Sequence, residues 1–226
     1  MYLSDLMYFL TIIMAIVCMI ASWRVSSVFK KYSRFRSMSG YTGGQAAAEI
    51  LRRNGITDVA VEPVAGNLTD NYDPVHRVVH LSESVFGSDS VAAVGVAAHE
   101  CGHVLQHYQG FVPLKLRTAF FPAASIGSRL GIPLAFIGLI FSINPLIDIG
   151  IWVFSLAVLF QLITLPVEFD ASRRALVMIQ DYGFLGAEEA DGSRKVLKAA
   201  AMTYVAAAAT SIVQLLRLMA LRGRRD

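Results

Sequence analysis

The sequence has little charge and only two cysteines. Charged residues make up 16% of the 226 residues and hydrophobic residues 55%, and a soluble domain of this length does not need so much apolar surface. Cys18 lies in an apolar run and Cys101 in a histidine motif, so no disulfide framework is indicated and a reducing compartment fits. The chain has 20 Lys and Arg against 17 Asp and Glu, and this small excess of positive charge does not indicate nucleic acid as a partner. The composition therefore predicts a membrane protein with the lipid bilayer as a partner.

The N-terminus lacks both a basic start and a small-residue cleavage site, which excludes an ordinary cleaved signal peptide. Residues 6–23 contain no charge and are about long enough to cross a bilayer core. We expect residues 1–25 to form an uncleaved transmembrane anchor. By the positive-inside rule its N-terminus is outside and the following residues are cytoplasmic, because basic residues come only after the run: Arg24, Lys30, Lys31, Arg34 and Arg36.

Residues 26–118 have an ordinary charge density and are expected to form a cytoplasmic α+β part. The pattern predicts a helix that begins near residue 43 and ends at Gly55, and strands at 59–64 and 76–83. The turn-rich residues between the strands are expected to place Asn71, Tyr72 and Asp73 in a turn near the cleft. A second helix is predicted over 88–110, with a Ser/Asp start and Gly110 as its end.

Residues 119–166 are again strongly apolar and are expected to form a transmembrane helical hairpin, with helices at about 130–143 and 146–165. The alternative is a buried soluble core. Residues 167–226 are expected to hold a cytoplasmic third-ligand helix and a C-terminal apolar helix. The segment 199–221 either forms a fourth span or packs in the cytoplasmic part, because a crossing would place three arginines outside, against the charge rule: Arg222, Arg224 and Arg225.

The motif His-Glu-Cys-Gly-His at 99–103 is the strongest sign of chemistry. Residues four apart share one helix face, so His99 and His103 can aim two imidazoles at one metal ion. Glu100 then lies beside the ion, where a carboxylate can act as general base, as in other H-E-x-x-H sites. A single histidine on an apolar helix is more often a core residue. An unpaired glutamate between two histidines in an Ala/Val-rich helix would, however, be costly to bury without a function.

The third ligand must come from elsewhere in the chain. His107 is eight residues from His99, about 12 Å along a helix, so we expect it either to contact a ligand residue without binding the metal itself or to lie at the surface. Two crossings by the hairpin would return the chain to the face of His103 just before Glu168 and Asp170. Glu168 is the preferred ligand, with Asp170 or Arg174 as orienting neighbours; the alternative is an interfacial carboxylate paired with arginine. The acidic residues of the polar stretch 188–191 resemble a solvated loop instead.

Four blocks taken in chain order resemble the YugP-like neutral zinc metallopeptidases over nearly the whole chain: LTDNYDPVHRVVHLSESVF, AAHECGHVLQH, LPVEFDASRRAL and VLKAAAMTYVAAA. The layout also resembles HtpX and CAAX-type membrane proteases. The resemblance implies a gluzincin-like site with one Zn²⁺ per chain, held by His99, His103 and Glu168, with Glu100 as catalytic base. One departure is Ser172, where such relatives tend to carry an aspartate that orients a zinc histidine; Asp170 is the nearest substitute.

The expected fold is therefore mostly α with a small β-sheet, in an integral membrane protein with three to four transmembrane helices and a cytoplasmic zincin-like catalytic domain. The expected function is hydrolysis of peptide bonds in a peptide or membrane-protein substrate, at the cytoplasmic face of the bacterial cell membrane. Tyr204 is a candidate oxyanion donor or else a packed aromatic residue. The strand near residues 77–83 could present an edge to an extended substrate.

Two other classes stay open. One is a membrane zinc-binding sensor or assembly factor without proteolytic activity. The other is a transporter or channel component, for which Arg129 within an apolar run is the only indication, although a helix start at the interface explains it equally.

Overall fold

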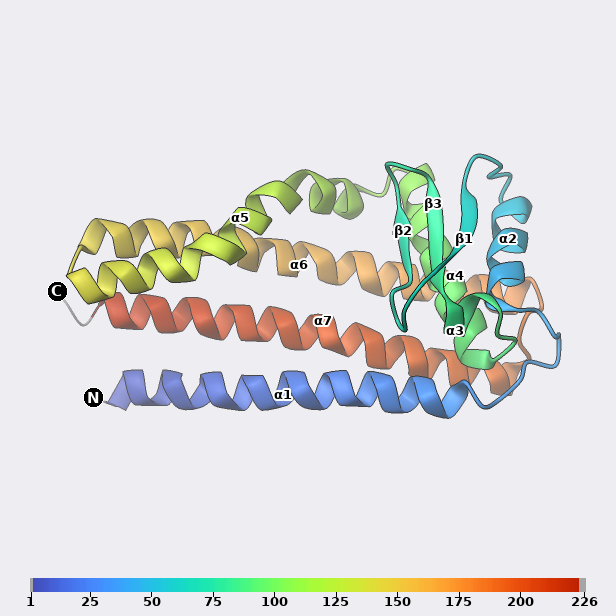
Figure 1. The fold of residues 1–226 in the computed structure, drawn as a ribbon, viewed down its shortest axis with the longest axis horizontal. Helices are drawn as coiled ribbons and strands as arrows, with labels where there is room; N and C mark the ends of the chain where they lie inside the picture. Colours follow the sequence, from blue (N-terminus) through green and yellow to red (C-terminus); the bar gives the residue numbers. More distant parts are fainter. Residues whose placement is uncertain (1, 224–226) are drawn as a thin grey trace. The chain divides into compact units, whose positions relative to one another are not determined.

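The computed structural model describes residues 2–223 as seven helices and one small sheet, so the chain is mostly helical (Figure 1). Met1 and residues 224–226 lie outside this range, and with them the predicted outer position of Arg224 and Arg225. The elements in chain order are α1 Tyr2–Tyr32, α2 Gly43–Arg53, β1 Ala60–Val64, β2 Asn71–Asp73, β3 Val78–Ser82, α3 Glu83–Phe86, α4 Val91–Tyr108, α5 Val112–Phe141, α6 Asn144–Asp181 and α7 Ala187–Arg222.

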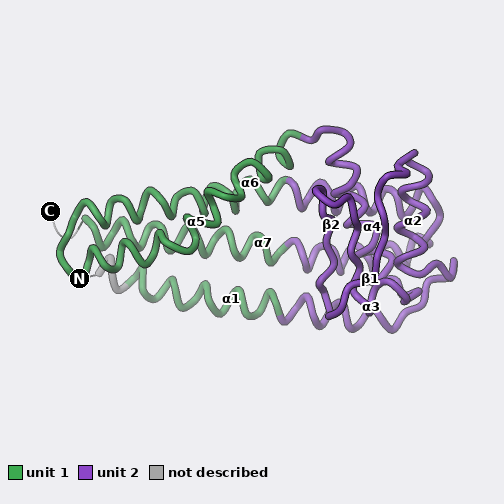
Figure 2. The backbone as a smooth tube through the Cα atoms, turned by 45° about the horizontal axis from the view of Figure 1, so that its top comes forward, with its two compact units in different colours: residues 1–22, 112–166, 202–226 green, residues 23–111, 167–201 purple. Residues whose placement is uncertain are grey.

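The chain divides into two compact units, and neither is continuous in sequence (Figure 2). Unit 1 contains 1–22, 112–166 and 202–226, and unit 2 contains 23–111 and 167–201. Helices α1, α6 and α7 each belong to both units, so the chain passes between the units within regular helices.

The core of unit 2 forms where α2, the sheet and α4 meet the C-terminal end of α6 and the N-terminal part of α7. Helix α2 begins at a capping box, in which the Thr42 and Gln45 side chains bond each other's backbone N–H. It ends before Gly55, whose φ of +70° suits glycine. Both predicted helix ends are thus confirmed. In β3 the side chains alternate, with Val79 and Leu81 fully buried.

The sheet order corrects two expectations. Strand β3 lies between β1, which is parallel to it, and β2, which is antiparallel, so it has no free edge. The residues 71–73 form β2 and not a turn. The Asp70 carboxylate explains this pairing, because it accepts hydrogen bonds from the Ser82 backbone N–H at 2.7 Å and from its hydroxyl. This contact fastens the start of β2 to the end of β3.

Unit 1 contains the helical hairpin, whose helices are longer than predicted. Helix α5 continues through Pro122 and Pro133, and Figure 1 shows it bent. Proline removes one backbone hydrogen bond and kinks a helix, but apolar helices of this kind tolerate it. The turn is Ser142 and Ile143, and the residues from Asn144 onward are already helical. Helix α5 therefore begins well before the predicted start near residue 130.

Small residues bring α5 and α6 close together within the hairpin. A Cβ added to Gly131 would lie 2.6 Å from Cβ of Phe154, and one added to Gly127 would lie 2.5 Å from the Val153 carbonyl oxygen. On the other helix, Gly150 approaches the backbone of Ala135 in the same way. This is the close packing through small residues that is typical of helices in lipid.

Four helices are long and apolar enough to cross a membrane: Leu6–Tyr32, Val112–Phe141, Asn144–Asp181 and Ala187–Arg222. The fourth corresponds to the segment for which the sequence left two possibilities open. Within unit 1, Cys18 Sγ lies 3.1 Å from Thr210 Oγ1, and the Arg217 guanidinium lies 5.4 Å from the centre of the Tyr8 ring. These two contacts place α1 and α7 side by side and antiparallel.

Candidate metal site

Helix α4 carries the histidine motif in the interior of unit 2. Its first turn is capped by the Ser90 side chain, which accepts a hydrogen bond from the Ala93 backbone N–H. Gly102, inside the motif, lies against α6: a Cβ there would be 2.6 Å from the Ala171 carbonyl oxygen. A residue without a side chain is therefore needed for the two helices to approach this closely. The segment of α6 that belongs to unit 2 begins at Val167, and the close approach brings the start of this segment next to the two histidines.

Three side chains meet at this point. The Oε2 atom of Glu168 lies 3.3 Å from Nε2 of His99 and 3.7 Å from Nε2 of His103. One possible ligand atom from each lies within 4.8 Å of the others, and this is the only such group of three among the described residues. Glu168 and His103 are buried, with 2% and 8% exposure, and the His99 side chain is mostly covered. The structure thus brings together the three residues that the sequence proposed as ligands.

His103 is held from behind by Gln106, which the sequence analysis did not identify. Gln106 Oε1 lies 3.1 Å from Nδ1 of His103. The amide nitrogen of Gln106 donates to the Val167 carbonyl oxygen at 2.8 Å and to Oδ2 of Asp170 at 3.0 Å. Asp170, proposed as an orienting group, thus reaches His103 only through Gln106. The spacing from His103 could have suggested Gln106, since residues three apart share a helix face.

Asp170 is held in turn by two arginines. Nε of Arg174 donates to Oδ2 of Asp170 at 2.5 Å, and Arg173 pairs with Oδ1. Arg174 also donates to Oε1 of Gln109 at 2.5 Å. Arg174 therefore contacts the site through Asp170, as one of the two expected orienting neighbours.

His99 has a different partner. Its Nδ1 lies 3.2 Å from Oγ of Ser172. This is the position at which the resembling proteases carry an aspartate, so a hydroxyl here occupies the place of a carboxylate. A histidine that binds a metal through one ring nitrogen usually has a hydrogen-bond partner at the other. Both histidines meet this condition.

Glu100 lies on the same helix but is not a member of the group of three. Its side chain is buried, with 7% exposure. Burial raises the pKa of Glu100 to about 7, while the nearby His99 and a hydrogen bond from the Tyr72 backbone oppose this rise. The hydrogen bond from Tyr72 places β2 next to Glu100.

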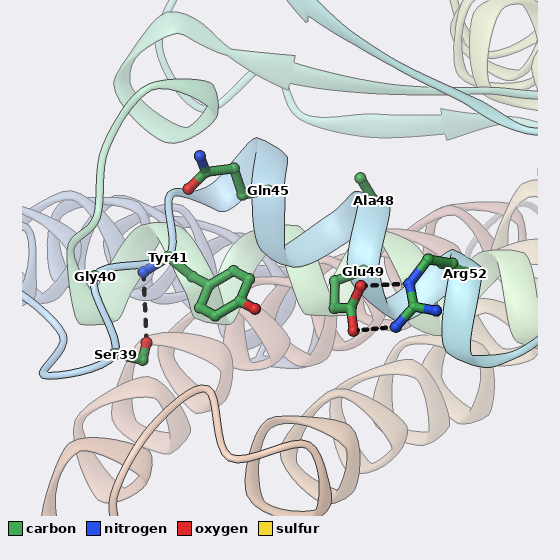
Figure 3. A pocket seen from close by; sticks show the side chains of 7 residues that line it. All are labelled: Ser39, Gly40, Tyr41, Gln45, Ala48, Glu49 and Arg52. Atoms are coloured by element: carbon green, nitrogen blue, oxygen red, sulfur yellow. Dashed lines mark hydrogen bonds and ion pairs between the residues drawn. The ribbon is translucent and has the colours of Figure 1, made fainter.

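The other proposed residues lie elsewhere. His107 is exposed, and its Nδ1 lies 2.7 Å from the Tyr72 hydroxyl. Tyr204 lies on α7 in the part that belongs to unit 1. A separate open pocket of about 520 Å³ lies along α2 and the loop before it, and Arg52 in the last turn of α2 holds the carboxylate of Glu49 there (Figure 3). None of the three candidate ligands lines this pocket: its residues are Ser39, Gly40, Tyr41, Gln45, Ala48, Glu49 and Arg52.

The donor set fits zinc. Zinc binds imidazole nitrogen and carboxylate oxygen at ~2.0–2.2 Å, so the ligands of a tetrahedral site lie roughly 3.4 Å apart. The observed separations of 3.3 and 3.7 Å are close to this value. Two histidines and one glutamate also leave one position open, as catalytic zinc sites do.

Comparison with known proteins agrees with this chemistry. Residues 7–223 match the model of a family described as "Putative neutral zinc metallopeptidase". The chain is also 50% identical over 225 residues to a Bacillus subtilis (strain 168) protein named "Putative membrane protease YugP", covering 98% of this chain and 99% of the relative. No solved structure matches the chain. The chain belongs to the neutral zinc metallopeptidase family.

Proposed function

We propose that this protein is a membrane-bound zinc endopeptidase in which His99, His103 and Glu168 hold one Zn²⁺ and Glu100 is the general base. The observation that carries the proposal is the meeting of the two Nε2 atoms with the Glu168 carboxylate, at 3.3 and 3.7 Å. The family match and the name of the relative support a proteolytic role.

Each residue then has a distinct task. A bound zinc ion would supply Lewis acidity, which polarises a carbonyl group and makes a water molecule more acidic. Glu100 takes a proton from the attacking water as its oxygen bonds to the peptide carbonyl carbon. Glu100 then gives that proton to the leaving amine as the C–N bond breaks. Tyr204 is a candidate hydrogen-bond donor to the oxyanion that forms from the peptide carbonyl, on the basis of the sequence alone.

The substrate is proposed to be a peptide or membrane-protein segment in an extended conformation. Strand β2 is an edge strand, since no strand in residues 2–223 pairs with its other side. The hydrogen bond from the Tyr72 backbone to Glu100 brings this strand beside the proposed base. An extended segment that adds to the free edge would therefore be led toward Glu100. Strand β2 takes the role that was expected of β3.

Two contacts within unit 1 and the distribution of charge support a proposal for the membrane topology. The Arg222 guanidinium lies 2.9 Å from Oδ1 of Asp148, so the C-terminal end of α7 meets the start of α6. Arg217 meets Tyr8 at the same end of α7. We infer that α7 is a fourth span and that both termini are outside. Unit 2 and its metal site are then at the cytoplasmic face of a bacterial cell membrane, the side favoured by the basic residues after α1.

Glu100→Gln tests the proposed function directly. The glutamine keeps the shape of the side chain but cannot accept the proton, so we expect a fall in hydrolysis of about 10²–10⁴-fold. Bound zinc is expected to stay at one ion per chain, because Glu100 is not a ligand. Purified full-length protein in detergent would be assayed for zinc by elemental analysis and for cleavage of a casein-like substrate.

Glu83→Gln is the matched control, since Glu83 lies on α3 and is not part of the proposed site. It should keep both zinc and hydrolysis. Loss of zinc in Glu100→Gln would mean that Glu100 has a structural role. Zinc without any cleavage by the wild-type protein would favour a zinc-binding sensor or assembly factor.

A further inference from the structure

We propose that Gln106 is a positioning residue: its side-chain amide fixes the tautomer and ring orientation of His103 and ties that histidine to the backbone next to Glu168. This inference rests on the proposed zinc site, and it identifies the group that orients one of its ligands. Gln106 is fully buried, at 0% exposure, so its amide cannot exchange these partners for water.

The direction of the Gln106 amide follows from its partners. The Val167 carbonyl oxygen and the ionised Asp170 carboxylate can only accept hydrogen bonds. The NH₂ group must therefore face them, and its two hydrogens are used at 2.8 and 3.0 Å. Arg174 and Arg173 pair with the Asp170 carboxylate at the same time. Rotation of the amide by 180° would place oxygen against oxygen at both contacts.

The proton on His103 follows in turn. With its nitrogen committed, Gln106 presents only Oε1 to Nδ1 of His103, at 3.1 Å. An acceptor at this position favours the tautomer of neutral His103 with its hydrogen on Nδ1, in competition with the Glu168 carboxylate, an acceptor near Nε2. The lone pair is then on Nε2, the atom that faces Glu168 at 3.7 Å. The chain Arg174, Asp170, Gln106 and His103 thus selects the tautomer that can bind a metal through Nε2.

The same amide also constrains the third ligand. Val167 immediately precedes Glu168 on α6, and its carbonyl oxygen accepts from Gln106. One side chain of α4 therefore holds His103 and the backbone that carries Glu168 in register. Loss of this amide should loosen two ligands together.

The test compares two substitutions of Gln106 by their stability and by their zinc affinity. If Gln106 only supports the fold, the zinc affinity should follow the stability. If Gln106 positions His103, the two variants should rank in opposite order by these two measures. Gln106→Met fills the same space without polar atoms. Gln106→Glu keeps an oxygen for His103 but places a second carboxyl beside Asp170. A buried carboxyl next to another acid costs more stability than a methionine, so the unfolding temperature of the zinc-free protein should be lower for Glu than for Met.

The zinc affinity is expected to follow the opposite order. Competition of the full-length protein in detergent with a chromogenic chelator should give a zinc Kd about 10–100-fold weaker for Gln106→Met than for wild type, with Gln106→Glu between the two. Gln180→Met is the matched control, because Gln180 is an exposed residue of α6 outside the group of three, and its zinc Kd should equal that of wild type. A Kd order that follows the unfolding temperatures, or an unchanged Kd in Gln106→Met, would overturn the proposal.

A second readout works whether or not zinc binds. ¹⁵N-histidine NMR of the zinc-free wild-type protein, at a pH well above the histidine range, should show His103 with its hydrogen on Nδ1; single substitutions assign the five histidines. Gln106→Met should give a mixture of tautomers. A wild-type His103 with its hydrogen on Nε2 refutes the role of Gln106. Wild-type protein with the expected tautomer but no zinc affinity refutes the proposed function instead.

Discussion

At the scale of single residues, the candidate site is built from side chains that each have a defined neighbour. The two histidines share Glu168 on one side and have separate partners on the other: Ser172 for His99 and Gln106 for His103. Such second partners orient the imidazole rings before a metal binds, which lowers the cost of ordering them.

Replacement of Glu168 tests whether it is a ligand. Glu168→Gln keeps the shape but removes the negative charge that zinc prefers, so we expect zinc affinity to fall at least tenfold and hydrolysis to be lost. Chelator competition and elemental analysis would measure the first effect. Glu188→Gln is the control, because Glu188 lies in the first turn of α7 and not in the group of three. Equal zinc affinity in the two variants would show that the third ligand is another residue.

Helix spacing alone was sufficient to propose His99 and His103. The requirement for an even number of crossings narrowed the third ligand to Glu168 or Asp170, of which Glu168 was preferred. The contact of Ser172 with His99, and those of Gln106 with Val167 and Asp170, could not be assigned in this way. Their roles depend on the register in which α4 packs against α6, and the close approach at Gly102 sets that register. The resemblance implies that a carboxylate orients a zinc histidine, whereas Nδ1 of His99 has the Ser172 hydroxyl as its partner.

At the scale of secondary-structure elements, the contact between α4 and α6 is the most demanding. Gly102→Ala should lower the stability of the protein by about 1–3 kcal/mol, since the added Cβ has to push away the backbone of Ala171. The same displacement moves Glu168, so zinc affinity should fall as well. Thermal unfolding with and without zinc measures both effects.

Gly87→Ala is the comparison variant for Gly102, because a Cβ at Gly87 has no atom within 4 Å and Gly87 has a negative φ of −92°. It should leave the unfolding temperature and the zinc affinity nearly unchanged. If Gly102→Ala behaved like Gly87→Ala, the close packing of α4 on α6 would not control the site.

The hairpin allows a second prediction at this scale. Gly131→Ala places a methyl group 2.6 Å from Cβ of Phe154 and should force α5 and α6 apart, with a loss of about 1–3 kcal/mol. The unfolding temperature in detergent would measure this loss. Ser128→Ala, an exposed position one turn earlier on α5, should have little effect. Similar unfolding temperatures for the two variants would contradict the role of the small residues.

Most elements could be predicted from periodicity and caps, and the errors have physical causes. Strand β2 is only three residues long and contains Asn71 and Asp73, residue types that favour turns, so tertiary contacts at Asp70 decide its conformation. The first helix of the hairpin was predicted too short, since α5 continues through Pro122 and Pro133. In an apolar surrounding the backbone has no water to bond, which favours continued helix.

At the scale of the whole molecule, the proposed topology gives a testable arrangement of the termini. An alkaline phosphatase fused to the C-terminus should be active and a green fluorescent protein fused there should be dark, because both would be exported. Asn67→Cys, in the exposed loop before β2, should react with an impermeant maleimide only after the membrane is opened, with the wild-type chain as background. A fluorescent C-terminal fusion would show that α7 packs inside instead.

The division of unit 2 into two stretches of sequence has a consequence for synthesis. Residues 23–111 leave the ribosome first, with both histidines, but Glu168 and the helical segments that complete the core are made only after the hairpin. A nascent or truncated chain that stops before the hairpin is inserted thus carries His99, Glu100 and His103 without Glu168. Under the function proposed above, such a chain lacks one of its three zinc ligands, so hydrolysis would begin only once the hairpin is in the membrane.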